Sequence, residues 1–285
     1  MSPSLGTRAL GSPALRHRVA AMVASLPASF HLTDGPADVV ALDGDGDWTA
    51  RAQEALRGGA RALVVSDPEP RDTRGLLADA ERLGATIALD SPWSRNPAVP
   101  AAAAELSRRL SGGGGLLELE VVSGLGAPVL ATVAAQLALV RSLSGPVTSA
   151  KLVAATARGC TILGSMNPDA RVKLVTIQTD ARPTSARLRF IGRDGSVDLS
   201  IPDPSTSRPA ELTLTTRDGS ILMPTVFESA RRSVWRSLHS AVTADRPLND
   251  LDEFIGDADI VRALADELTA VPDHDFDTDR RRKTR

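Results

Sequence analysis

Short β-branched runs alternate with stretches of helical spacing in the first hundred residues, and no other feature constrains the fold as strongly. The runs that predict strands cover residues 7–12, 29–32, 37–44, 60–66 and 86–92. Apolar residues at helical spacing predict helices at 14–26, 48–59 and 73–85. Strands separated by single helices form a parallel sheet with helices on both faces, because the crossovers are right-handed. We therefore expect an α/β domain over residues 1–100.

The second half of the chain has the period-two alternation of half-buried strands instead. A glycine run at 112–115 marks the change, and two of the later turns, at 193–195 and 217–219, read Arg-Asp-Gly. An apolar helix is expected at 129–143 and a final helical region at 227–271. We predict an α+β domain with an open, mostly antiparallel sheet and helices on one face over 101–271. A disordered charged tail is expected at 272–285.

Composition excludes several classes of function. The net charge of −2 offers no general attraction to nucleic acid or to an acidic membrane, and the low aromatic content of 3% disfavours base stacking. The single cysteine, Cys160, cannot form a disulfide within the chain, and the histidines lack metal-ligand spacing. Residues 16–30 have some features of a signal peptide, but helical spacing favours an amphipathic helix. We expect a cytoplasmic protein without metal, nucleic acid or membrane partners.

Four stretches, taken in order, resemble the Gfo/Idh/MocA oxidoreductases over nearly the whole chain. The first two are ADVVALDGDGDWTARAQEAL at 37–56 and GGARALVVSDP at 58–68, which is similar to the strand that ends in the family's Glu-Lys-Pro motif. The others are LDSPWSRNPAVPAAAAEL at 89–106 and the closing helices at 227–268. The family consists of NAD(P)-dependent enzymes that mostly act on sugars and cyclitols. The resemblance implies that the first domain is Rossmann-like and, in this chain, truncated.

The resemblance places the cofactor's diphosphate at the loop LGSPAL, residues 10–15. A dinucleotide fingerprint uses several glycines, so that backbone N–H groups can approach the diphosphate at a helix N-terminus. This loop keeps one glycine, its proline lacks an N–H, and the short chain before it predicts an incomplete first strand. Asp34 is the candidate for the ribose hydroxyls, and the helix between the second and third strands is missing. The degenerate loop leaves NAD(P) binding open, with three candidate ligands: Gly11, Ser12 and Asp43.

The catalytic residues of the family are absent from the matching positions. The family lysine falls on Ser66 or Asp67, and neither supplies a cation. The family's acid–base aspartate and histidine fall on Ala131 and Ala135. A positioned acid–base group contributes about 10²–10⁴ in rate, so the chain resembles a catalytically degenerate member and we assign no catalytic residue. Four residues beyond the strand ends remain candidates for holding a ligand in the cleft: Asp67, Trp93, Arg95 and Asn96.

Three functions stay open, and with them the question whether the protein is an enzyme. The absence of the family's catalytic residues and of most phosphate-loop glycines favours a non-catalytic protein, which serves as a structural or regulatory partner of an active relative. We expect it in a homo- or hetero-oligomer that assembles through the C-terminal sheet. The first alternative is an active NAD(P)-dependent oxidoreductase of a sugar or cyclitol-like substrate, which uses Asp67 or a substrate group for proton transfer. The second alternative is a sensor that binds a small ligand without chemistry.

Overall fold

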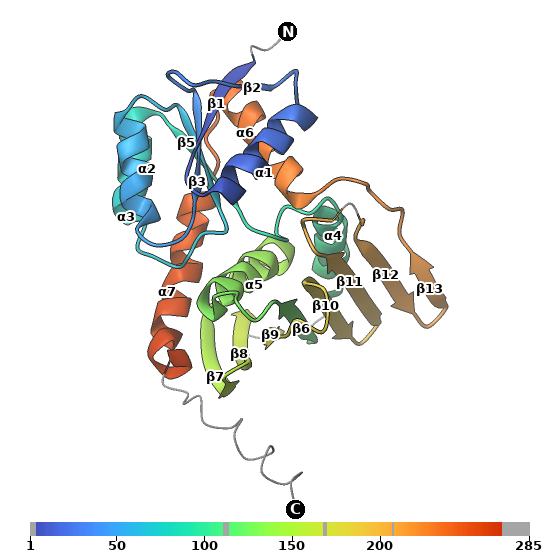
Figure 1. Ribbon diagram of the computed structural model, residues 1–285. Helices are drawn as coiled ribbons and strands as arrows, with labels where there is room; N and C mark the ends of the chain where they lie inside the picture. The colour runs from blue at the N-terminus through green and yellow to red at the C-terminus, as the bar shows by residue number, and fades with distance from the viewer. Residues whose placement is uncertain (1–3, 111–113, 168–169, 207, 270–285) are drawn as a thin grey trace, which may run out of the picture.

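Two β-sheets dominate the molecule, one from each half of the chain (Figure 1). The computed structural model describes residues 4–110, 114–167, 170–206 and 208–269. Within these residues a five-stranded parallel sheet is joined to an eight-stranded mixed sheet, as the sequence predicts. The predicted tail at 272–285 lies outside the described residues. No helix in the described ranges is long and apolar enough to cross a membrane.

The parallel sheet has the strand order β2-β1-β3-β4-β5. Its strands are β1 (Leu5–Leu10), β2 (Phe30–Leu32), β3 (Val39–Asp43), β4 (Ala62–Ser66) and β5 (Thr86–Asp90). The last three are buried on both faces, which explains why they read as continuous apolar runs. Because β2 and β3 lie on opposite sides of β1, the edge beyond β1 and β3 is a topological switch point, where such sheets bind ligands.

Helices cover both faces of the parallel sheet. Helix α1 (Pro13–Ser25) packs on one face through a core cluster that contains Leu15 and Val19. Helices α2 (Trp48–Arg57) and α3 (Arg74–Leu83) lie on the other face (Figure 1) and belong to a second cluster. Alternate residues of β3 and β4 contribute to the two clusters, as the period of a strand requires.

The N-terminal strand differs from the sequence prediction. It begins at Leu5 rather than at residue 7, and it pairs with β2 on one side and β3 on the other. The expectation of an incomplete first strand is therefore wrong, because Leu5 and Gly6 extend the strand and pair with Phe30 and His31 of β2. The missing helix is confirmed, since the described residues 33–38 between β2 and β3 contain none.

The second sheet has the order β13-β12-β11-β10-β6-β9-β8-β7, and in the described residues only the β6–β9 pair is parallel. The Arg-Asp-Gly sequences form the turns of the β10–β11 and β12–β13 hairpins, as predicted. Helices α4 (Ala98–Leu110) and α5 (Val129–Ser144) pack on it. Its strands are β6 (Leu116–Ser123), β7 (Ser149–Thr156), β8 (Gly159–Asn167), β9 (Ala170–Gln178), β10 (Ser185–Gly192), β11 (Gly195–Pro202), β12 (Glu211–Thr216) and β13 (Gly219–Leu222).

The last two helices bring the chain back to the parallel sheet (Figure 1). Helix α6 (Ala230–Thr243) packs against β4 and β5, with Trp235 and Leu238 in the same core cluster as α1. Helix α7 (Asp250–Thr269) packs against α5 and β5. Because the chain comes back to the parallel sheet here, the first turn of α6 lies at the carboxyl ends of β4 and β5. The domain limits of 1–100 and 101–271 stay a prediction.

Candidate functional site

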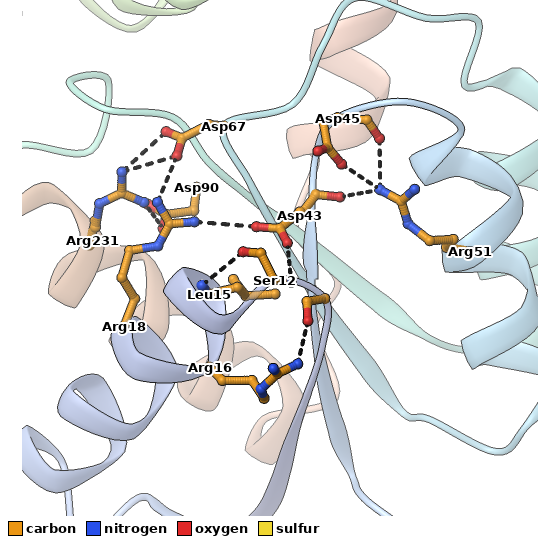
Figure 2. A network of polar contacts seen from close by, with 11 residues as sticks. Ser12, Leu15, Arg16, Arg18, Asp43, Asp45, Arg51, Asp67, Asp90 and Arg231 are labelled. Atoms are coloured by element: carbon orange, nitrogen blue, oxygen red, sulfur yellow. Dashed lines mark hydrogen bonds and ion pairs between the residues drawn. The ribbon is translucent and has the colours of Figure 1, made fainter.

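The start of α1 and the end of β3 meet at the switch point (Figure 2). The hydroxyl of Ser12 accepts a hydrogen bond from the N–H of Leu15 at 3.1 Å and so caps the helix. The N–H of Ser12 itself donates to Oδ2 of Asp43 at 2.7 Å. A Cβ on Gly11 would lie 2.5 Å from the same oxygen, so only glycine admits the carboxylate this closely. The three residues predicted as cofactor ligands thus form one cluster, and their binding of a cofactor stays a prediction.

Three aspartates at neighbouring strand ends share two arginines (Figure 2). Arg18 of α1 lies 3.5 Å from Oδ1 of Asp43 and 3.4 Å from Oδ2 of Asp67. Arg231 of α6 donates to Asp90 at 2.7 Å and to both oxygens of Asp67 at 3.2 Å. The chain's own side chains therefore fill this sheet edge with alternating charges, three carboxylates against two guanidinium groups.

Burial sets the protonation behaviour of the Asp90–Arg231 pair. Asp90 is 2% exposed, and its Oδ1 has no hydrogen-bond partner among the described residues. Burial raises the pKa of the Asp90 carboxyl and Asp67 adds to the rise, whereas Arg231 opposes it. Burial works against the charge of Arg231, but Asp90 and Asp67 outweigh it and hold its pKa above the ordinary value. Arg231 is therefore a fixed cation behind the ends of β4 and β5.

Asp67 has a backbone conformation that few residues other than glycine adopt. Its φ is +52°, in the left-handed region, where aspartate is tolerated better than most side chains. Its side chain is 40% exposed, although Arg18 and Arg231 both contact it. Strained backbone of this kind is found most often at functional sites. Asp67 is therefore a candidate functional residue on structural grounds as well.

A cleft with a volume of about 360 Å³ lies between the two sheets, a size typical of small-molecule sites. The parallel half contributes the segments after β4 and β5 and the start of α6, and the other half contributes the end of β6 and the start of α5. Two of the four predicted ligand residues, Asp67 and Trp93, line this cleft.

Two buried polar groups at the cleft lack partners. The indole Nε1 of Trp93 and the hydroxyl of Ser123 are buried and make no hydrogen bond to any described residue. Trp93 is 3% exposed and Ser123 is 5% exposed. Unsatisfied buried groups are uncommon, because each costs about 1–3 kcal/mol. A water or a hydroxylated ligand that enters the cleft would supply the missing bonds.

The other two predicted ligand residues lie elsewhere, which corrects the expectation of a single cleft. Arg95 and Asn96 line a separate cavity of about 520 Å³. Arg95 forms an ion pair with Asp250 of α7. The side-chain oxygen of Asn96 accepts a hydrogen bond from the N–H of Ala98 at 3.0 Å, at the start of α4. Asp250 of α7 therefore holds the Arg95 side chain and the start of α4 holds that of Asn96, and their ligand role stays a prediction.

Helix α5 gives the cleft an apolar wall. Ala131 and Ala135, the positions that correspond to the family's acid–base pair, both line the cleft. Gln136 is fully buried and is bound to strand β9 instead. Its Nε2 donates to the carbonyl of Val175 at 2.9 Å, and its Oε1 accepts from the hydroxyl of Thr176 at 3.0 Å. In the described structure, α5 therefore places no ionisable group in the cleft.

The ionisable groups that line the cleft, within the described ranges, are Asp67, Asp203 and Arg231. Asp203 lies after β11, and its carboxylate already accepts the N–H of Ser205 at 2.8 Å and its hydroxyl at 2.7 Å. Ser66, the other residue at the family lysine position, is buried. Asp67 is thus the carboxylate that stands beside a fixed cation. The described residues contain no cluster of His, Cys, Asp and Glu that could hold a metal ion.

The switch point has the donors that a phosphate group needs. Gly11 admits a close oxyanion, the N–H of Ser12 at the helix N-terminus binds one, and Arg18 adds positive charge. The spacing Ala9-x-Gly11-x-x-Ala14 also follows the dinucleotide fingerprint, with alanine in the first position, a match that the sequence analysis overlooked. Gly11, Ser12 and Arg18 therefore have the chemistry that a dinucleotide's diphosphate requires. In this structure the carboxylate of Asp43 accepts the hydrogen bond from Ser12 instead.

No protein-family model matches this sequence, and no curated protein does. Solved structures do match. The 3-ketoreductase KijD10 from Actinomadura kijaniata, in complex with NADP, has a TM-score of 0.73 at 12% identity, with 92% of this chain and 96% of that chain covered. The UDP-N-acetylglucosamine 3-dehydrogenase GnnA from Acidithiobacillus ferrooxidans has a TM-score of 0.67 at 16% identity, with 95% and 98% covered. An oxidoreductase from Sinorhizobium meliloti has a TM-score of 0.73 at 13% identity, with 94% and 98% covered.

This chain has the two-domain fold of these oxidoreductases. The identities are low enough that the likeness establishes the fold alone. Because the match covers 96% of KijD10 and 98% of GnnA, the comparison does not confirm a truncated chain. It also gives no support to the expectation of a non-catalytic partner subunit.

Sequence analysis missed the two arginines and Asp90. The sequence does contain a pattern that indicates a charged cluster. Each of three successive buried strands ends at or next to an aspartate, and these are Asp43, Asp67 and Asp90. Three carboxylates at one sheet edge require nearby cations. Arg18 lies within the helix predicted at 14–26, and nothing in its local sequence indicates that it contacts these strand ends. Arg231 could not be assigned, since its contacts with Asp67 and Asp90 join segments 164 and 141 residues apart.

Proposed function

We propose that this protein is an oxidoreductase that acts on a small polyhydroxylated substrate of the sugar or cyclitol kind, with NAD(P) as electron carrier. The cleft carries the proposal, because a half-exposed carboxylate, a fixed cation and two unpartnered buried polar groups meet there. The neighbours add support: KijD10 is a 3-ketoreductase also solved with TDP-benzene and NADP, and GnnA is a UDP-N-acetylglucosamine 3-dehydrogenase.

The lining residues have distinct tasks in this proposal. Asp67 accepts a hydrogen bond from the substrate hydroxyl that is oxidised, and takes up its proton as the carbonyl forms. Arg231 keeps the carboxylate in place through contacts at 3.2 Å with both of its oxygens. The indole N–H of Trp93 and the hydroxyl of Ser123 bind other hydroxyls of the ring. A substrate with several hydroxyls satisfies these groups, whereas an apolar substrate leaves them unpaired.

NAD(P), when bound, takes up or supplies the two electrons of the reaction. Gly11, the N–H of Ser12 and Arg18 would hold its diphosphate at the switch point. The same sheet edge therefore serves both halves of the reaction, since the end of β4 carries Asp67 while the neighbouring ends of β1 and β3 carry the anion site.

The proposal is tested by turnover of NADPH with a panel of keto-sugars, nucleotide sugars and cyclitol ketones. We expect the wild type to reduce at least one of them and Asp67→Asn to lose about 10²–10⁴ in kcat. Asparagine also tolerates the left-handed backbone, so the fold should survive. Asp45→Asn is the matched control, because Asp45 is an exposed aspartate on a neighbouring loop, paired with Arg51, and should leave kcat unchanged. Equal activity of the Asp67 variant would remove Asp67 from the reaction.

A further inference from the structure

Asp43 occupies the position at which the switch point binds an oxyanion. Its Oδ2 accepts the N–H of Ser12 at 2.7 Å and lies 2.5 Å from where a Cβ on residue 11 would stand, so the glycine makes room for it. Its Oδ1 faces Arg18 at 3.5 Å. The side chain is 18% exposed, so it lies largely inside the site rather than in solvent. The N–H of Ser12 and the guanidinium of Arg18, two donors that would hold a phosphate at the start of α1, are thus already engaged by this one carboxylate.

A phosphate cannot share this position with Asp43. Two anionic groups this close repel each other, and they do so more strongly where burial lowers the local dielectric. Pro13, the residue next to Ser12, has no N–H, and the N–H of Leu15 already donates to the hydroxyl of Ser12. Arg18 cannot compensate fully, because the same guanidinium also pairs with Asp67.

From these contacts we propose that Asp43 is an internal competitor of the cofactor's diphosphate. Its carboxylate must leave Gly11 and Ser12 before a phosphate oxygen binds there. This inference rests on the proposed function for the identity of the anion. Departure of Asp43 also frees Arg18, which joins the diphosphate and loosens its contact with Asp67. Asp43 therefore weakens cofactor binding. In the protein without cofactor, its carboxylate pairs with the N–H of Ser12 and with Arg18.

The experiment measures the binding of NADPH and of inorganic pyrophosphate to the full-length chain by calorimetry. We expect Asp43→Asn to bind both at least about tenfold more tightly than wild type, since the change removes a like charge and keeps the shape. Asp43→Ser provides a second neutral variant if the first folds poorly. Asp45→Asn is the matched control, because it removes the same charge from a neighbouring loop, where Asp45 pairs with Arg51 (Figure 2). Its affinities should stay within about twofold of wild type.

Unchanged or weaker binding of both probes by the Asp43 variants overturns the inference, and so does an equal gain in the Asp45 control. Binding of neither probe to any variant also overturns it. The proposed function fails separately: a tenfold gain in affinity without turnover of any substrate leaves Asp43 as a competitor but removes the oxidoreductase assignment. Wild type that binds NADPH tightly and turns over substrate, together with no gain in the affinity of Asp43→Asn, overturns only the inference that Asp43 is a competitor. The proposed function then stands.

Discussion

Asp43 and Asp67 stand at neighbouring strand ends, yet their surroundings give them different roles. Asp43 is bound by a backbone N–H and points into the start of α1. Asp67 has a backbone in the left-handed region, its carboxylate is held by the side chains of Arg18 and Arg231, and it lines the cleft. A carboxylate held by side chains can exchange one of these contacts for a substrate hydroxyl. For this reason we place the proton transfer on Asp67.

The unpartnered hydroxyl of Ser123 gives a residue-scale prediction. Ser123→Ala should leave the free energy of unfolding unchanged or raise it by up to about 1 kcal/mol, because the lost hydroxyl has no bond in the empty protein. The same change should raise KM about 2–10-fold, since a substrate hydroxyl loses its partner.

Thr176→Val is the control for that prediction. Its hydroxyl is equally buried but donates to Gln136 at 3.0 Å, so its removal should cost about 1–2 kcal/mol and leave KM unchanged. Chemical denaturation and steady-state kinetics measure both quantities. A Ser123 variant that loses stability as Thr176→Val does, without a change in KM, would contradict a ligand-binding role for Ser123.

At the scale of elements, the contact between α5 and α7 includes a buried ion pair as well as apolar packing. Asp257 of α7 is 2% exposed and accepts from Nε of Arg141 at 3.0 Å. Burial raises the pKa of Asp257 to about 6 and Glu253 adds to the rise, while Arg141 opposes it. The folded protein therefore binds a proton at this carboxyl between pH 3.8 and about 6, where the unfolded chain does not.

This raised pKa predicts that stability falls as pH rises through that window. The free energy of unfolding of the wild type should drop by up to about 3 kcal/mol between about pH 4 and about pH 6, relative to Asp257→Asn. Urea denaturation of both proteins at several pH values measures the difference. A difference that stays constant with pH, or one that favours the wild type as pH rises, would show that Arg141 keeps the pKa of Asp257 at or below its ordinary value.

At the scale of the whole molecule, the sequence predicts what depends on neighbours along the chain. The buried runs of β3, β4 and β5 and the two Arg-Asp-Gly hairpins were read correctly, because local periodicity and turn chemistry determine them. The cluster of Gly11, Ser12 and Asp43 was also found, since carboxyl ends of parallel strands meet at one edge.

The features that could not be predicted from the sequence depend on contacts between segments far apart in the chain. The return of α6 to β5, which places Arg231 behind Asp67 and Asp90, has no local signature. The side chain of Trp93 lines one cavity and those of Arg95 and Asn96 line another, and no local pattern along the chain indicates this division. Assembly through the C-terminal sheet, with a second copy or an active relative, stays a prediction, as does a cytoplasmic location.

The proposed function requires that electrons pass between NAD(P) and a hydroxylated substrate in the cleft. Its most direct test is incubation of the full-length protein with NADPH that carries deuterium at C4 of the nicotinamide, together with the panel of keto-sugars and cyclitol ketones. Mass spectrometry of the products measures the transfer. We predict one carbon-bound deuterium in the product of at least one substrate. Bound NADPH with no deuterium in any product would contradict the account.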